Sequence, residues 1–171
     1  MMTTNEKAKD LFDEGMSAFV GTEFDKSIAL LTEALEHEPE FKLALIGRGS
    51  AYLKLNRLDE ALADFDRVVT IDGSYARAFH LRGLVREKLG DDAAAVKDFN
   101  RAVALDPEYG AAYYSRGAVH AKMSNDDQAL KDMQTAAQLG SVNLEKYMDT
   151  ANVWHTQHMR VEDAIETELE R

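Results

Sequence analysis

Two histidines and a glutamate near the carboxyl end have a spacing that could bind a metal ion. His155 and His158 are three residues apart and Glu162 follows four residues later, so a helix would place all three along one edge. The sequence has 0 cysteines and no second histidine pair to complete a ligand set. An ordinary polar helix surface explains the three residues better, and we expect no metal site and no cofactor.

Other residues with catalytic potential are also better explained without catalysis. Asp91-Asp92 and Asp126-Asp127 resemble acidic metal pairs, but they stand where helices are expected to begin, and carboxylates there interact favourably with the helix dipole. Gly47-Arg48-Gly49 lacks the Lys-Ser/Thr that follows in a phosphate-binding loop. The remaining histidines are isolated: His37, His80 and His120. We therefore expect a protein that is not an enzyme.

Three arginines recur with an aspartate at a constant distance further along the chain. The pairs are Arg48–Asp64, Arg82–Asp98 and Arg116–Asp132. The segment before the first pair has neither residue, because Glu14 and Leu30 take the two places. In antiparallel helices these positions face each other, which predicts a structural ion pair within each segment. The alternative is that the arginines bind an acidic ligand.

The elements that carry these pairs repeat with a period of 34 residues. The period is marked by Gly15, Gly49, Gly83 and Gly117. When position 1 is set at Ala8, Lys42, Ala76 and Gly110, these glycines occupy position 8, position 4 is large and apolar, and position 20 is small. Positions 4, 8 and 11 share one helix face, and positions 20, 24 and 27 share a face of a second helix. Such a period is typical of stacked helix pairs.

This pattern closely resembles the tetratricopeptide repeat, whose hallmark residues recur at these offsets. The resemblance implies an all-α, right-handed α-solenoid of four helix pairs, preceded by an N-terminal extension over residues 1–7. The four units cover residues 8–41, 42–75, 76–109 and 110–143. The expected helices cover about residues 5–20, 24–37, 42–55, 58–71, 76–89, 92–105, 110–123 and 126–139. Position 7 departs from the family, because arginine replaces the usual leucine in the last three units.

The sequence predicts that residues 144–171 form a capping helix that continues as a projecting C-terminal helix. This long helix is expected to cover about residues 143–168. Tyr147, Ala151 and Trp154 repeat positions 4, 8 and 11 of a first helix, so they are expected to pack on the fourth unit, near Ala129, Met133 and Ala136. Beyond them lies an apolar stripe at a spacing of four: Val161, Ile165 and Leu169. We expect this stripe to meet solvent, the concave face or another molecule.

The charge distribution excludes several classes of partner. The net charge is −11, and the acidic excess lies in residues 1–41 and 144–171, while the segment between them is neutral. Nucleic acids and anionic membranes need basic surfaces, so neither is an expected partner. The N-terminus lacks the apolar core of a signal peptide, and the absence of cysteine fits a reducing compartment. These features favour a cytoplasmic protein.

In the family, first helices line a concave groove, and the resemblance assigns peptide contacts to positions 2, 5, 6, 9, 12 and 13. The implied groove residues are Phe12, Met16, Phe19, Ile46, Ser50, Leu53, Lys54, Arg77, His80, Leu84, Lys88, Tyr114 and Lys122. Their amino-terminal half is apolar and Lys54, Lys88 and Lys122 form a basic edge. We expect an exposed apolar surface there; the alternative is that neighbouring helices cover it. The clamp for acidic tails found in heat-shock co-chaperones is missing, because Phe12, Met16, Gly47 and Ser50 stand at its positions.

The sequence therefore predicts a protein–protein interaction scaffold that binds a peptide or helix of a partner in its groove. The alternative is a homo-oligomeric assembly protein that uses the projecting C-terminal helix. Trp154 and the four period-marking glycines are assigned structural roles, as are the three arginine–aspartate pairs.

Overall fold

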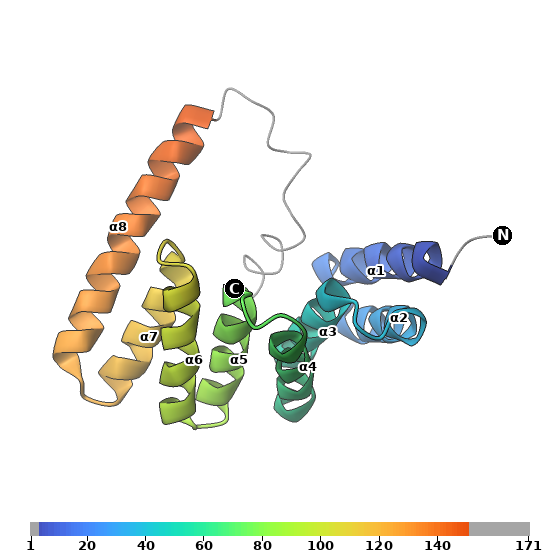
Figure 1. The fold of residues 1–171 in the computed structure, drawn as a ribbon, viewed down its shortest axis with the longest axis horizontal. Coiled ribbons are helices and arrows are strands. Elements are labelled where there is room, and N and C mark those ends of the chain that lie inside the picture. Colours follow the sequence, from blue (N-terminus) through green and yellow to red (C-terminus); the bar gives the residue numbers. More distant parts are fainter. Residues whose placement is uncertain (1–3, 151–171) are drawn as a thin grey trace. The chain divides into compact units, whose positions relative to one another are not determined.

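The computed structural model describes residues 4–150, and the side chains of residues 141–150 are not described. The described residues form eight helices and no strand (Figure 1). The all-α class is thereby confirmed. Trp154, the stripe formed by Val161, Ile165 and Leu169, and the candidate ligands His155, His158 and Glu162 lie outside the described residues, so the expectations for them stay predictions.

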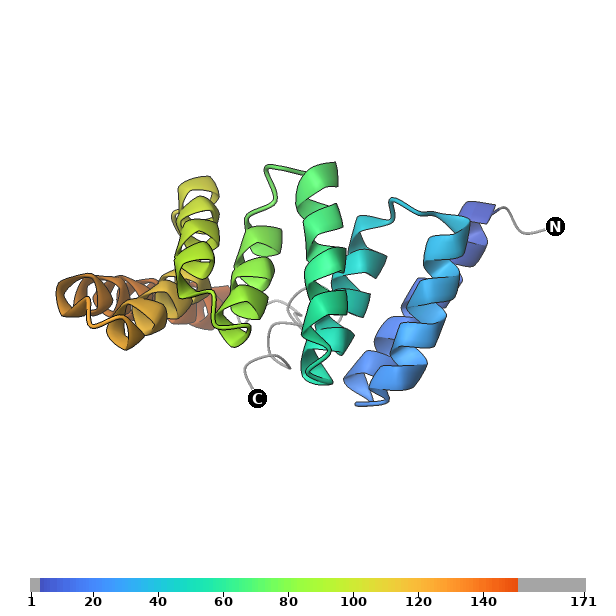
Figure 2. The same ribbon diagram turned by 90° about the horizontal axis from the view of Figure 1, so that it is seen from below.

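The helices form two compact units, each containing two repeats. The N-terminal unit, called the N-terminal pair because it holds two repeats, comprises α1 (Thr4–Val20), α2 (Phe24–His37), α3 (Lys42–Lys54) and α4 (Leu58–Ile71). The C-terminal pair comprises α5 (Ala76–Lys88), α6 (Asp92–Leu105), α7 (Gly110–Lys122) and α8 (Asp126–Thr150). Within each pair, every first helix packs on its own second helix, and the second helix packs on the next first helix (Figure 2).

Each first helix ends in a left-handed turn at position 15 of its repeat. The backbone φ is positive at Thr22, Asn56, Gly90 and Ser124. The following residue donates its N–H back across the turn, as in the 2.8 Å bond from Arg57 N to Tyr52 O. These bonds close a Schellman-type cap and reverse the chain into the second helix. In the first repeat a threonine, Thr22, adopts this conformation.

The period-marking glycines lie where two helices come closest. An added Cβ at Gly83 would lie 2.5 Å from the Phe99 ring, and one at Gly49 would lie 2.9 Å from Phe65. Gly15 and Gly117 are buried at the equivalent contacts. In the first three repeats, glycine at position 8 leaves the space that the large side chain at position 24 fills between the helices. The structural role assigned to the four glycines is confirmed, since all four are buried at helix contacts.

The expected end of the eighth helix near residue 139 is wrong. Helix α8 continues to Thr150 and extends past the end of α7 (Figure 1). The chain has Pro39 and Pro107 at position 32 of the first and third repeats but Ser141 in the fourth, so no proline interrupts the helix. Gly140 alone does not end it. Tyr147 therefore lies in α8 itself, not in a following helix that packs on it.

Candidate functional site

Apart from Lys54, the predicted groove residues of the N-terminal pair are buried. Phe12 is 5% exposed and Ile46 0%. The others are buried as well: Met16, Phe19, Ser50 and Leu53. The expectation of an exposed apolar surface along this part of the chain is therefore wrong.

Neighbouring helices cover these side chains. The Phe12 ring packs against Phe41 at the start of α3, with ring centroids 4.9 Å apart, and Phe19 packs edge-on against Phe24 at 5.4 Å. Met16 fills the space that a side chain at Gly47 would need, since an added Cβ there would lie 2.7 Å from the Met16 sulfur. These residues belong to the core of the N-terminal pair. The positions of the co-chaperone clamp are thus occupied by packing and carry no cation.

In the C-terminal pair, a buried histidine ties the two first helices together. His80 on α5 is 5% exposed. Its Nδ1 lies 2.9 Å from the Tyr109 hydroxyl, and its Nε2 lies 3.0 Å from the Ser115 hydroxyl. Burial, and to a lesser extent the positive charge of Arg77, lowers the pKa of His80 from 6.5 to about 3. His80 is therefore neutral at pH 7, with one ring nitrogen donating and the other accepting.

The remaining predicted groove residues differ in exposure. Lys88 and Lys122 are exposed at the ends of α5 and α7, whereas Lys54 and Leu84 are half-buried and Arg77 is 9% exposed. The Lys122 ammonium donates to the Asp92 carboxylate at 2.7 Å, and this hydrogen bond raises the pKa of Lys122.

Asp91 caps α6 as expected, because its carboxylate accepts from Ala94 N at 3.0 Å.

Tyr114 is the one large residue at position 5 that reaches the surface. It is 61% exposed, whereas Phe12, Ile46 and His80 at the same position are buried. The cause lies at position 34, where Phe41 packs on Phe12 and Tyr109 packs on His80 with ring centroids 5.0 Å apart. In the fourth repeat, position 34 is residue 143, which lies inside α8. We call the exposed surface over Leu84, Lys88, Tyr114 and Lys122 the α5–α7 face.

The three predicted arginine–aspartate pairs are confirmed. Each arginine donates from Nε and Nη2 to the two carboxylate oxygens of its aspartate, at 2.6–2.9 Å. The aspartates are buried: Asp64, Asp98 and Asp132. The hydrogen bonds that the guanidinium groups donate to the carboxylates raise the pKa of Arg48 and of Arg116. Bidentate geometry and burial make these the strong kind of charge-assisted hydrogen bond.

The same arginines also reach back to the preceding repeat. Arg48 Nη1 donates to the Thr32 hydroxyl at 3.1 Å, and Arg116 Nη1 donates to Asn100 Oδ1 at 2.8 Å. The arginine at position 7 thus joins its own second helix to the preceding second helix. Because Nε, Nη1 and Nη2 of both arginines are engaged, the structural interpretation is favoured over an acidic ligand.

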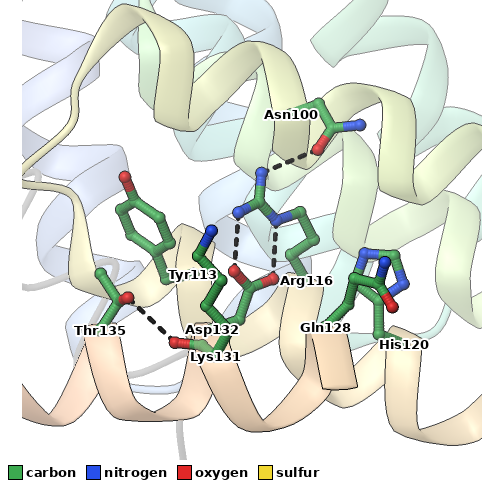
Figure 3. A pocket seen from close by; sticks show the side chains of 8 residues that line it. All are labelled: Asn100, Tyr113, Arg116, His120, Gln128, Lys131, Asp132 and Thr135. Carbon is green, nitrogen blue, oxygen red and sulfur yellow. Dashed lines mark hydrogen bonds and ion pairs between the residues drawn. The ribbon is translucent and has the colours of Figure 1, made fainter. Parts of the chain in front are cut away.

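A pocket of about 460 Å³ opens beside the last of these pairs (Figure 3). It lies among α6, α7 and α8, on another side of α7 from Tyr114. Its lining residues are Asn100, Tyr113, Arg116, His120, Gln128, Lys131, Asp132 and Thr135. This pocket is not among the sites predicted from the sequence. The sequence signal for it is the change of residue type at positions 11 and 26 between the third and fourth repeats.

Among residues 5–140, whose side chains the structure describes, no group of three or more His, Cys, Asp and Glu side chains is placed to hold a metal ion. Within the same part of the chain, no helix combines the length and apolar character that crossing a membrane requires.

Family models match most of the repeat region. A model described as tetratricopeptide repeat matches residues 12–76, and one described as TPR repeat matches residues 88–124. Among curated proteins, the chain is similar to Hsc70-interacting protein 1 of Drosophila melanogaster, with 35% identity over 86 residues, which is 50% of this chain and 23% of the relative. It is also similar to the Protein SGT1 homolog of Oryza sativa subsp. japonica, with 32% identity over 76 residues, 44% of this chain and 21% of the relative. The matches thus span less than a quarter of these relatives.

Solved structures share the fold. The first TPR of Spaghetti (RPAP3) bound to the HSP90 peptide SRMEEVD is 26% identical, with a TM-score of 0.68, and the match covers 70% of this chain and 95% of that one. MamA 41-end from Desulfovibrio magneticus RS-1 is 20% identical, with a TM-score of 0.73 and coverage of 79% and 76%. The second likeness concerns the fold alone.

Proposed function

Because the chain belongs to the tetratricopeptide repeat family, and is a protein-binding repeat domain, we propose that its α5–α7 face binds a carboxylate-rich segment of a partner protein. The exposure of Tyr114 is the observation that carries this proposal. A tyrosine that is 61% exposed on a first helix offers a large, rigid contact surface at low entropic cost. The buried equivalents in the other repeats cannot offer it.

The charges beside Tyr114 favour an acidic partner segment. Lys88 and Lys122 extend from the ends of the two first helices, and the hydrogen bonds of His80 to Tyr109 and Ser115 hold those helices in a fixed spacing. Half-buried Leu84, which packs on the core residues Ala95, Phe99 and Val119, adds apolar surface. A segment with carboxylates and an apolar side chain would match this set.

The comparisons support the same partner chemistry. The RPAP3 domain binds SRMEEVD, a peptide with three carboxylate side chains, and other relatives are named for interaction with Hsc70. This chain has no cation at the clamp positions Phe12, Met16, Gly47 and Ser50, which are buried. Acidic-peptide binding is therefore proposed for the C-terminal pair, and the HSP90 peptide SRMEEVD serves as a probe of binding to carboxylates.

Fluorescence anisotropy with labelled SRMEEVD tests the proposal on the full chain. We expect saturable, salt-sensitive binding that weakens about three- to tenfold in Lys88→Glu and in Tyr114→Ala, since exposed charges and contacts are each worth about 1 kcal/mol. The peptide SRMQQVN is the charge control and should bind more weakly than SRMEEVD. Asp59→Lys, on the exposed side of α4, is the matched protein control. Equal binding of both peptides, or no binding, would contradict the proposal.

A second candidate function is homo-oligomeric assembly, favoured by an exposed leucine at the end of the described repeats. Leu130 on α8 is 61% exposed, whereas Val96 at the same repeat position packs against the core residues Ala95, Phe99 and Val119. The apolar stripe of Val161, Ile165 and Leu169 in a second copy would suit this surface. Light scattering of the full chain, of Leu130→Ser and of a chain ending at Arg160 separates the two candidates. A concentration-independent monomer in all three would remove the assembly function.

A further inference from the structure

The third repeat shows what normally occupies the space of the Figure 3 pocket. In that repeat, Asp98 accepts from two arginines. Arg82 donates to both oxygens at 2.6 and 2.9 Å, and Arg86 Nη1 donates to Oδ2 at 2.8 Å. A second guanidinium beside the aspartate is therefore compatible with this backbone, because the chain supplies one from position 11.

The fourth repeat keeps the aspartate and lacks the second arginine. Both described side-chain donors on the Asp132 carboxylate belong to Arg116, at 2.7 Å. Position 11 is His120, whose Nδ1 lies 3.5 Å from Asn125 Nδ2. Asp132 Oδ2 can therefore accept one further hydrogen bond, as Asp98 Oδ2 does from Arg86 Nη1.

A shorter residue at position 26 of the fourth repeat enlarges the same space. Position 26 is Arg101 in the third repeat, where its guanidinium lies 5.8 Å from the Phe79 ring centroid. In the fourth repeat position 26 is Thr135, whose hydroxyl donates back to Lys131 O at 2.9 Å. The pocket of about 460 Å³ therefore occupies the place of two long arginine side chains (Figure 3).

The second repeat fills the corresponding place in another way. Its position 11 is Tyr52, and the guanidinium of Arg57 stacks on that ring at 4.6 Å. A cation lies near position 11 in both the second and the third repeat. In the fourth repeat, Arg116 at position 7 is the one arginine described there, and no second guanidinium is described beside position 11.

We propose that this pocket binds the guanidinium group of an arginine side chain from a partner protein. The guanidinium donates to Asp132 Oδ2 in the way that Arg86 donates to Asp98, and the side-chain oxygen of Gln128 is a further acceptor among the lining residues. The site is independent of the α5–α7 face, because Tyr113, Arg116 and His120 lie on a different side of α7 from Tyr114.

The arginine that lines the pocket is not free to bind an anion. Arg116 is the strongest cation in the pocket, but its Nε, Nη1 and Nη2 already donate to Asp132 and Asn100. Lys131 also lines the pocket; the third repeat has Lys97 at the same repeat position, and Arg86 still pairs with Asp98 there.

Amide NMR of the full chain, titrated with N-acetyl-arginine amide, tests the proposal. We expect saturable shifts confined to residues around Arg116, His120, Gln128 and Asp132. N-acetyl-citrulline amide, which keeps the shape without the charge, should bind at least about tenfold more weakly, as the loss of a charged hydrogen bond implies. N-acetyl-lysine amide should also bind more weakly, since an ammonium lacks the planar fork.

His120→Arg is the decisive variant. It gives the fourth repeat the residue that the third repeat already carries, so the fold is retained and the pocket is filled from within the chain. We expect it to abolish the shifts caused by N-acetyl-arginine amide while binding of SRMEEVD is unchanged, which separates this site from the proposed function. Lys88→Ala should leave arginine binding intact. Equal shifts with citrulline, unchanged binding in His120→Arg, or no saturable shift would overturn the proposal.

Discussion

The two repeat pairs use the same helix positions for opposite purposes. In the N-terminal pair, position 5 of the first helices carries Phe12 and Ile46, and both side chains are buried in the core. In the C-terminal pair, the same position carries His80, which makes buried polar contacts, and Tyr114, which is 61% exposed. A repeat position therefore does not define a binding residue; the neighbouring first helix decides whether it is core or surface.

The difference follows from one aromatic residue at the start of the next first helix. Phe41 covers Phe12 and Tyr109 covers His80, each at a centroid distance of about 5 Å. The fourth repeat continues as α8 through the position where that residue would stand, so nothing equivalent covers Tyr114. The exposed aromatic residue at this position is consequently found in the C-terminal pair, whereas the sequence pattern predicted the exposed apolar surface in the N-terminal one.

The largest expected effect is on the stability of the N-terminal pair. Phe12→Ala should lower the free energy of unfolding by about 3–5 kcal/mol, since it removes a buried aromatic side chain and leaves a cavity. Tyr114→Ala should change it by no more than about 0.5 kcal/mol, because that ring is largely in solvent. Urea denaturation measures both, and similar losses for the two variants would break the comparison.

The second prediction sharpens the comparison between the third and fourth repeats. Asp98→Ala leaves Arg82 and Arg86 without their shared carboxylate, and it should cost about 1–3 kcal/mol. Asp132→Ala affects Arg116 alone among the described cations, so its cost should be smaller. Thermal denaturation of both variants decides this order. A larger loss for Asp132→Ala would contradict the account of the second arginine.

The third prediction concerns pH. The pKa of buried His80 is lowered to about 3, so the unfolded chain, with its ordinary value of 6.5, binds the proton first as the pH falls. The stability contributed by neutral His80 is therefore complete above pH 6.5 and is lost as the pH falls from 6.5 towards 3, by at most about 1.4 kcal/mol per pH unit.

His80→Phe provides the control for this pH dependence, because phenylalanine occupies the same position in the first repeat. Urea denaturation is measured between pH 6.5 and 5, because this interval lies above the pKa of ordinary carboxylates. The wild-type chain should lose stability across this interval, and the variant should lose less. Identical slopes would show that His80 titrates normally in the folded state.

The smallest expected effect on stability is that of Lys88→Ala. Its side chain is exposed at the end of α5, so the free energy of unfolding should change by no more than about 0.5 kcal/mol. Binding of an acidic peptide should nevertheless weaken. A binding loss without a stability loss is the signature of a surface contact, and a parallel loss of both would contradict the assignment of Lys88 to the α5–α7 face.

Much of the fold could be predicted because the 34-residue period reports local geometry. Seven of the eight helices begin and end within one residue of the expected bounds, and the close contact at Gly83 follows from its small size. The end of α8 could not be predicted from the period, since Ser141 departs from the proline or glycine that stands at this position in the first three repeats. Burial of Phe12 and exposure of Tyr114 could not either, because both depend on the residue at position 34, where one repeat leads into the next.

The pocket beside Asp132 had a signal in the sequence, namely the replacement of Arg86 and Arg101 by His120 and Thr135. Its meaning became visible once the structure placed Arg86 on Asp98 and Arg101 beside the Phe79 ring. The burial of Phe12, Met16 and Phe19 also changes what their substitution tests. Replacing these three residues by alanine would disrupt the core of the N-terminal pair, so a loss of partner binding could not be assigned to a groove.

The most direct test of the central claim is amide NMR of the full chain with and without SRMEEVD. The account predicts shift changes along α5 and α7, centred on Leu84, Lys88, Tyr114 and Lys122, and none beyond the noise along α1 and α3. Changes centred on Phe12, Met16 and Ile46 would contradict it, because they would show that the first helices of the N-terminal pair bind the peptide.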